Sequence, residues 1–245
     1  MKLLFLLIIT LLAPSVHAEG RNILYQVDGK SYEGYYVSPS ETAPLILLIH
    51  DWNGLTNYEE IRANMLADAG YAVIAADLFG AGIRPTEDND KRQHTGELYR
   101  DREKMRALMQ GALDAAKAEG ASVDRVVAMG YCFGGAAVLE LARSGAELNG
   151  FVSFHGGLIT PEGQSYQNTK GKVLVFHGTA DSAITMEQFA QLARELETAG
   201  IPHEMTAYGG APHGFTEFGS DRYREEADKA SWQRFLVFLE QVRAQ

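Results

Sequence analysis

Apolar runs of strand length alternate with segments of helical period through most of this chain. Five runs contain few polar residues: "PLILLIH" (44–50), "YAVIAAD" (71–77), "RVVAM" (125–129), "FVSF" (151–154) and "VLVFH" (173–177). Such strands are typical of parallel sheets that helices cover on both faces. The pattern predicts an α/β fold with a mostly parallel, doubly wound sheet, in which ligands bind at the carboxyl ends of the strands.

The segments between these runs are predicted to be helices. Asn57 and Glu60 have the spacing of a capping box, and so do Thr185 and Gln188. Other helices are expected from Leu98 to Ala116, from about Gly134 to Ser144, and through Phe235 and Leu239, after a last strand at 203–208.

Two segments do not fit this alternation. Residues 23–39 alternate in polarity around the turn signal Asp28-Gly29, so we expect an antiparallel hairpin at the sheet edge. Residues 84–97 are polar, and we expect a solvated surface loop there, with a flap over the site as the alternative. Because no repeat or Pro/Ser-rich linker marks a boundary, residues 19–245 are interpreted as one domain.

Residues 1–18 have the pattern of a secretory signal peptide. Lys2 precedes an uncharged apolar stretch, and Val16 and Ala18 suit the −3 and −1 positions of a leader peptidase site. A membrane anchor is the alternative, but the apolar run is shorter than the roughly 20 residues of a spanning helix, and Pro14 interrupts it. We therefore expect a periplasmic or secreted protein with no membrane association after cleavage.

Composition narrows the possible partners and chemistry. The formal net charge of −10 argues against nucleic-acid binding, which needs a basic face. The single cysteine, Cys132, cannot form an intramolecular disulfide. It is therefore either a small buried hydrophobe or a reactive thiol.

The residues around Cys132 favour the reactive thiol. Gly130 and Gly134 flank it in a G-x-C-x-G pattern between a predicted strand and a predicted helix. A nucleophile on such a sharp turn needs small neighbours two residues away, so that strand and helix can approach each other. The turn also sets the sulfur near the positive end of the helix, which favours thiolate. Glycine-rich turns without catalytic function also occur in α/β proteins, and this alternative remains open.

A thiol nucleophile needs a base, and the base needs an orienting acid. In folds with this elbow the chain order is nucleophile, acid, histidine. Asp181 follows the strand at 173–177, and His213 lies in a glycine-rich loop after the strand at 203–208. The alternatives are a turn-capping role for Asp181 and a surface-loop role for His213.

Three further histidines, His50, His155 and His177, lie at the ends of predicted strands. Each of them could be a hydrogen-bonded residue in the wall of the site or could take part in its chemistry.

The loop "HDWNGLT" (50–56) follows the first long strand of the predicted parallel sheet. An acyl-transfer site needs two backbone donors for the oxyanion, and the positions predict the amides of Trp52 and Phe133. Asp51 would lie near Cys132 and influence its protonation, or it would cap the loop.

The motifs "HDWNGL", "AADLFG", "GYCFGG", "FHGTAD" and "GAPHGFT", in this order, resemble those of the dienelactone hydrolase family of the α/β-hydrolase superfamily. The resemblance covers the chain after the leader. It implies a triad of Cys132, His213 and Asp181, a backbone oxyanion hole from Trp52 and Phe133, and hydrolysis of a small-molecule ester or lactone. It also implies that neither a metal nor an organic cofactor is used.

The chain departs from the family at positions that contact substrate. Members that act on dienelactones carry arginines at the positions that correspond to Glu217 and to a residue at or near Ala81. Arg84 is the candidate replacement for the second arginine, and Asp51 stands where the family usually has Glu. Dienelactone is therefore not the expected substrate.

We interpret the chain as a monomeric exported carboxylic ester hydrolase. The alternative is a non-catalytic binding module, or a thiol that reacts with oxidants.

Overall fold

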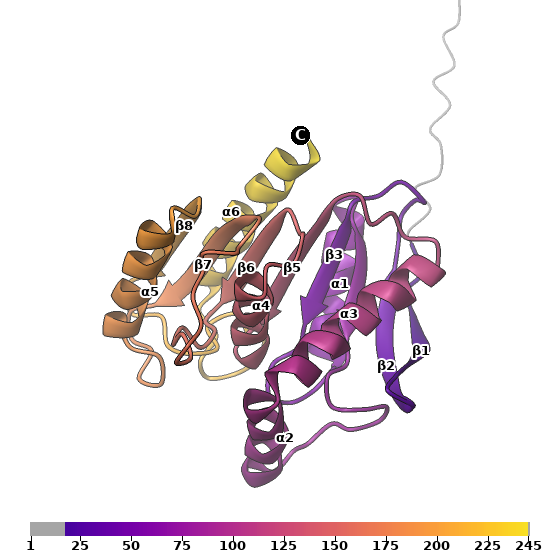
Figure 1. Cartoon of the computed structure of the whole chain (residues 1–245), viewed down its shortest axis with the longest axis horizontal. Helices are drawn as coiled ribbons and strands as arrows, with labels where there is room; N and C mark the ends of the chain where they lie inside the picture. Colours follow the sequence, from indigo (N-terminus) through magenta and orange to yellow (C-terminus); the bar gives the residue numbers. More distant parts are fainter. Residues whose placement is uncertain (1–17, 245) are drawn as a thin grey trace, which may run out of the picture.

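The computed structural model describes residues 18–244, so the expected leader lies almost entirely outside the described residues. One sheet contains the strands of this range, in the spatial order β1-β2-β4-β3-β5-β6-β7-β8 (Figure 1). Their bounds are β1 Arg21–Val27, β2 Lys30–Val37, β3 Leu45–Ile49, β4 Ala72–Ala76, β5 Val126–Tyr131, β6 Gly150–Phe154, β7 Lys172–Gly178 and β8 His203–Tyr208.

The sheet is parallel except at one edge. β1 pairs antiparallel with β2, and β2 pairs antiparallel with β4, whereas β3 to β8 pair in parallel. Asp28 and Gly29 form the hairpin turn with positive φ angles of 51° and 73°. The predicted α/β-hydrolase fold with an antiparallel N-terminal hairpin is therefore confirmed.

Helices cover both faces of the sheet (Figure 1). Their bounds are α1 Asn57–Asp68, α2 Asp88–Arg100, α3 Arg102–Ala118, α4 Phe133–Arg143, α5 Met186–Ala199 and α6 Glu225–Arg243. α3, α4 and α5 share one apolar cluster with the sheet, and α1 and α6 share the other. Between residues 18 and 244, no helix combines the length and the apolar character that crossing a bilayer requires.

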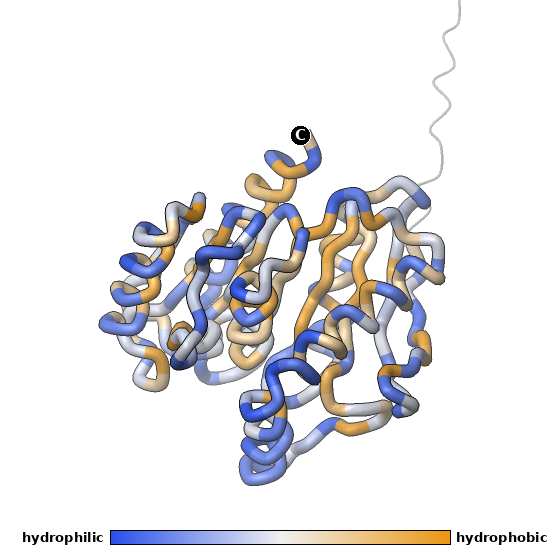
Figure 2. The backbone as a smooth tube through the Cα atoms, viewed as in Figure 1, coloured by the Kyte–Doolittle hydropathy of each residue, from blue (hydrophilic) through white to orange (hydrophobic). Residues whose placement is uncertain are grey.

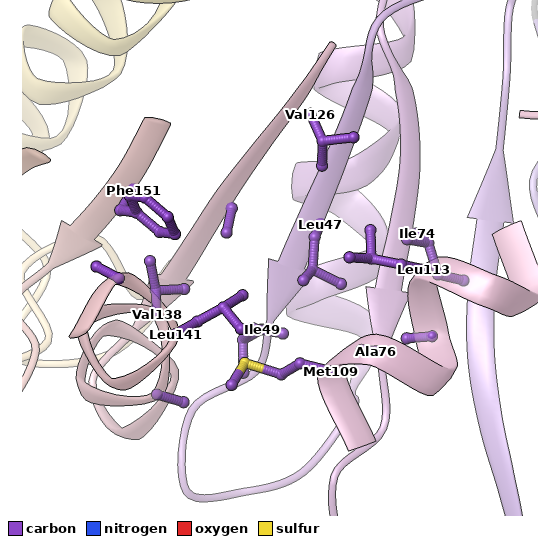
Figure 3. Packing of buried hydrophobic residues seen from close by; sticks show 14 of the residues in the cluster. Leu47, Ile49, Ile74, Ala76, Met109, Leu113, Val126, Val138, Leu141 and Phe151 are labelled. Carbon is purple, nitrogen blue, oxygen red and sulfur yellow. The ribbon is translucent and has the colours of Figure 1, made fainter. Parts of the chain in front are cut away.

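Alternate side chains of the central strands supply the two cores. Leu47 and Ile49 of β3 belong to the same cluster as Met109 of α3 and Val138 of α4 (Figure 3). Leu48, on the opposite face of β3, belongs to the cluster with α1 and α6. Because both of their faces are buried, the central strands β3, β4, β5 and β6 consist mainly of apolar residues. The helix α2, by contrast, is predominantly hydrophilic (Figure 2).

The polar stretch 84–97 is not the expected loop. Most of it forms α2, which is separate from α3, so the predicted long helix from Leu98 is two helices. Asp101 separates them: its backbone is not helical, and its carboxylate accepts a hydrogen bond from the Lys104 amide at 3.0 Å. Leu98 is buried, and His94 stacks on Phe79 with ring centroids 5.1 Å apart. Only a few residues of α2 pack against the rest of the protein, so few of its positions need to be apolar. The hydrophobic pattern of this helix is therefore weak in the sequence.

The capping box of α1 lies one residue earlier than predicted. Thr56 is the N-cap, and the Glu59 carboxylate accepts hydrogen bonds from both the Thr56 amide and its hydroxyl at 2.8 Å. The other carboxylate oxygen of Glu59 is buried without a hydrogen-bond partner. Burial, and then the nearby charge of Asp51, raise the pKa of Glu59 to about 8.

We expect Glu59→Gln to change how stability depends on pH. The folded-state pKa of Glu59 lies above its ordinary value of 4.5, so its contribution is fully present below that value and is lost as the pH rises through about 8. The variant should therefore gain stability relative to the wild type as the pH rises from about 5 to about 8, by on the order of 2 kcal/mol. Urea unfolding at both pH values measures this difference; a constant difference would contradict it.

Candidate active site

Cys132 occupies the sharp turn between β5 and α4. Its φ of 52° and ψ of −112° are strained for a residue with a side chain. A Cβ added to Gly130 would lie 2.3 Å from the carbonyl carbon of Gly134, and one added to Gly134 would lie 2.3 Å from the Ile49 oxygen. The two glycines therefore permit the close approach that the sequence pattern predicted.

Three side chains that are far apart in the sequence meet at this turn. His213 Nε2 lies 3.1 Å from Cys132 Sγ, and His213 Nδ1 lies 2.8 Å from Asp181 Oδ2. The other Asp181 oxygen accepts hydrogen bonds from the amides of Ala183 and Ile184, both at 2.9 Å. Asp181 therefore both caps its turn and holds the imidazole.

The electrostatics of these groups favour an ion pair. Burial alone would lower the pKa of His213, but hydrogen bonds to Asp181 and Cys132 and their charges raise it to about 10. Burial alone would raise the pKa of Asp181, but the hydrogen bonds from His213 and the Ile184 amide hold it below its ordinary value. A protonated imidazole beside the Asp181 carboxylate is therefore favoured.

The thiol faces an open pocket of about 330 Å³. Trp52 and Asp51 line it together with residues of the His213 loop. The remaining walls include Tyr58, Tyr131, His155, Ser182, Ala183, Thr216, Glu217 and Arg222. A small ester fits such a space beside the sulfur.

Two backbone amides near the sulfur are candidates for an oxyanion hole. Phe133 is the first residue of α4, so its amide has no acceptor within its own helix. The amide of Trp52 donates no hydrogen bond to any of the residues described. The Trp52 ring lies beneath α2, with Lys91 Nζ 5.0 Å from its centroid.

Asp51 has the loop-capping contacts that were one of its two predicted roles. Its carboxylate accepts hydrogen bonds from the Asn53 amide at 2.6 Å and from the Asn53 side chain at 3.1 Å. The carboxylate also lines the same pocket as Cys132. Burial, together with the charge of Glu217, raises the pKa of Asp51 to about 6 despite the Asn53 contact.

The other strand-end histidines are buried in the walls. The Leu78 amide donates to His50 Nε2 at 3.1 Å, so His50 Nδ1 donates to the Asp51 carbonyl at 2.6 Å. His155 packs edge-on against His213 with ring centroids 5.3 Å apart. His177 is fully buried against Phe189, and burial lowers the pKa of all three histidines.

Arg84 pairs with acids that do not line the pocket. Its guanidinium is 3.4 Å from the Glu33 carboxylate and 3.9 Å from that of Asp77. Glu33 belongs to β2 and Asp77 follows β4, and neither they nor Arg84 are among the lining residues. A contact between Arg84 and the substrate stays a prediction.

A hydrogen-bond network that no sequence pattern predicted holds the His213 loop. Arg62 of α1 donates to the Thr216 carbonyl at 2.9 Å and pairs with Asp228 of α6 at 2.5 Å. The Thr216 hydroxyl lies 2.8 Å from both the Tyr58 hydroxyl and His155 Nε2. These contacts join segments that are up to 166 residues apart in the sequence, which no local pattern can reveal.

Among residues 18–244, no cluster of three or more His, Cys, Asp or Glu side chains has an arrangement that could hold a metal ion.

Comparisons with known proteins find relatives over most of the chain. The model of the dienelactone hydrolase family matches residues 32–243. A carboxymethylenebutenolidase from Pseudomonas putida is 25% identical over 220 residues, which are 86% of this chain and 92% of the relative.

Two solved structures share the fold over 92% of this chain and 99% of their own. The structure of m3DLH is 32% identical with a TM-score of 0.84. That of a dienelactone hydrolase-like promiscuous phosphotriesterase from metagenomic libraries is 29% identical with a TM-score of 0.85.

We expect Arg62→Met to destabilise the protein by about 3–5 kcal/mol, because it leaves the buried Asp228 carboxylate without its guanidinium partner. The double variant Arg62→Met/Asp228→Asn should recover part of this loss, because the unpaired charge is then gone. Urea unfolding of the single and double variants measures both values. A loss below about 1 kcal/mol in the single variant would contradict a structural role for the pair.

Proposed function

This chain belongs to the dienelactone hydrolase family and is an ester-bond hydrolase, and we propose that it hydrolyses small esters or lactones with a Cys132–His213–Asp181 triad. One observation carries the proposal: the imidazole of His213 bridges the lone thiol and a hydrogen-bonded carboxylate at the open end of a pocket. These contacts support the proposal, because covalent acyl transfer needs a nucleophile, a base and an orienting acid within hydrogen-bonding reach of one another.

In the acylation step, the Cys132 thiolate attacks the carbonyl carbon. The carbonyl π electrons move to the oxygen, and the amides of Trp52 and Phe133 donate hydrogen bonds to this oxyanion. When the intermediate collapses, the bond to the alcohol oxygen breaks and the His213 imidazolium gives its proton to the leaving alkoxide. The product of this step is a thioester on Cys132.

In the deacylation step, neutral His213 takes a proton from water, and the resulting hydroxide attacks the thioester carbonyl. The carbon–sulfur bond breaks, the acid leaves, and the thiolate and imidazolium are restored. Asp181 keeps the same Nδ1 contact throughout and stabilises the charged ring. A thiolate leaves a tetrahedral adduct more readily than an amine does, so this nucleophile suits esters and lactones better than amides.

Cys132→Ala should lower kcat/KM for a short-chain aryl ester by at least about 1,000-fold, because it removes the sulfur that contacts His213 Nε2. Cys132→Ser, the matched control, retains a nucleophilic oxygen and should keep intermediate activity. Mass spectrometry of quenched wild-type reactions should find the acyl group on Cys132.

Unchanged turnover in the alanine variant would reject the triad. A wild-type protein that hydrolyses no ester or lactone, while its thiol reacts rapidly with peroxide, would instead support the redox alternative.

We also propose that the protein is exported, on the basis of the leader pattern in residues 1–18. The exported protein is proposed to be a monomer. The full chain, expressed in a bacterium with a periplasm, should yield a periplasmic protein that begins at Glu19. Intact mass and N-terminal sequencing check the cleavage site, and light scattering checks the oligomeric state. Retention of residues 1–18 in the membrane fraction would favour the anchor instead.

A further inference from the structure

Aspartate and glutamate outnumber lysine and arginine in the lining of the pocket around the thiol. Glu217 and Asp51 both line it, and Arg222 is the one arginine or lysine among the lining residues described. Resting on the proposed function, we propose that Glu217 and Asp51 select uncharged esters and lactones and exclude substrates that carry a carboxylate.

Glu217 neutralises the guanidinium that could otherwise attract an anion. Its Oε2 accepts a hydrogen bond from Arg222 at 2.8 Å, and both residues belong to the segment that follows His213. The Glu217 side chain is 30% exposed, so this ion pair lies at the mouth of the pocket rather than in the core. A substrate carboxylate would have to displace Glu217 from Arg222 before it could bind there.

Asp51 adds a second carboxylate to the lining of the pocket. It lies in the loop after β3 and is partly buried, and Asn53 provides its hydrogen bonds. The charge of Glu217 contributes to the raised pKa of Asp51, after the larger effect of burial. The two carboxylates therefore interact electrostatically, and any third carboxylate between them would be repelled by both.

The expected selectivity follows from Coulomb's law. At the effective dielectric constant of a protein surface, repulsion between a substrate carboxylate and one carboxylate of the pocket lowers the affinity for that substrate by about tenfold. An uncharged ester avoids this repulsion. Repulsion between solvent-accessible charges is also screened by salt, whereas steric exclusion is not.

The experiment uses two matched pairs of chromogenic or phenolic esters. One pair is the 4-nitrophenyl monoester of adipic acid and its terminal carboxamide, which differ in the charge of the acyl chain. The other is 4-acetoxybenzoate and 4-acetoxybenzamide, which differ in the charge of the leaving group. We expect wild-type kcat/KM to favour the neutral member by about tenfold in at least one pair, and about 0.5 M NaCl to reduce this preference.

Three variants assign the effect to residues. Glu217→Gln should reduce the preference for the neutral ester at least about fivefold, because Arg222 is then free to attract the carboxylate. Arg222→Gln should increase the preference, because Glu217 is then unpaired. The control, Glu225→Gln, removes an exposed carboxylate of α6 that pairs with Lys229. It should leave the kcat/KM values of the neutral and the charged esters unchanged.

The proposal is overturned if the wild type prefers the carboxylate-bearing ester, or if Glu217→Gln alters the preference no more than Glu225→Gln does. A preference that does not respond to salt would also overturn it, because it would then be steric. These outcomes differ from failure of the proposed function, in which the wild type hydrolyses neither member of either pair.

Discussion

The close approach of α4 to β3 is the constraint on which the site depends. Gly134 lies so near the backbone of Ile49 and His50 that no side chain fits there. This contact fixes the turn that forces Cys132 into a positive φ and places the sulfur at the carboxyl edge of the sheet. It also brings the first amide of α4 and the loop after β3 to the same point. Strain at one residue is tolerated because packing on both sides determines the backbone.

The two partners of the thiol are held in different ways. Asp181 is fixed locally, because two amides of its own turn bind the oxygen that His213 does not use. His213 lies in a long loop that depends on distant support, and Arg62 and Thr216 provide it. Asp228 and the Thr216 carbonyl compensate the buried charge of Arg62. The guanidinium also lies over the aromatic rings of Phe218 and Trp232, with its central carbon 4.2 and 4.9 Å from their centroids.

The pKa values of Asp181, Glu59 and Asp51 differ because their surroundings differ. Asp181 accepts several hydrogen bonds, which hold its pKa low, whereas Glu59 has one buried oxygen without a partner, and burial raises its pKa. Asp51 lies between these extremes. Acidic groups thus orient the imidazole, cap a helix and shape the pocket, and each function follows from hydrogen bonding and solvent access rather than from residue type.

The sequence by itself determined the order of strands and helices, the edge hairpin, the turn at Cys132, and the positions of Asp181 and His213 at the ends of late strands. These features depend on spacing within a few residues and on burial of both sheet faces, which leave a local pattern. Only the tertiary structure decided that α2 is a helix, that Arg84 pairs with Glu33, and that Arg62 supports the His213 loop. Each of these features depends on contacts between distant segments. Packing decides which of several possible ion partners a side chain meets, and the periodicity of a single sequence carries no information about that packing.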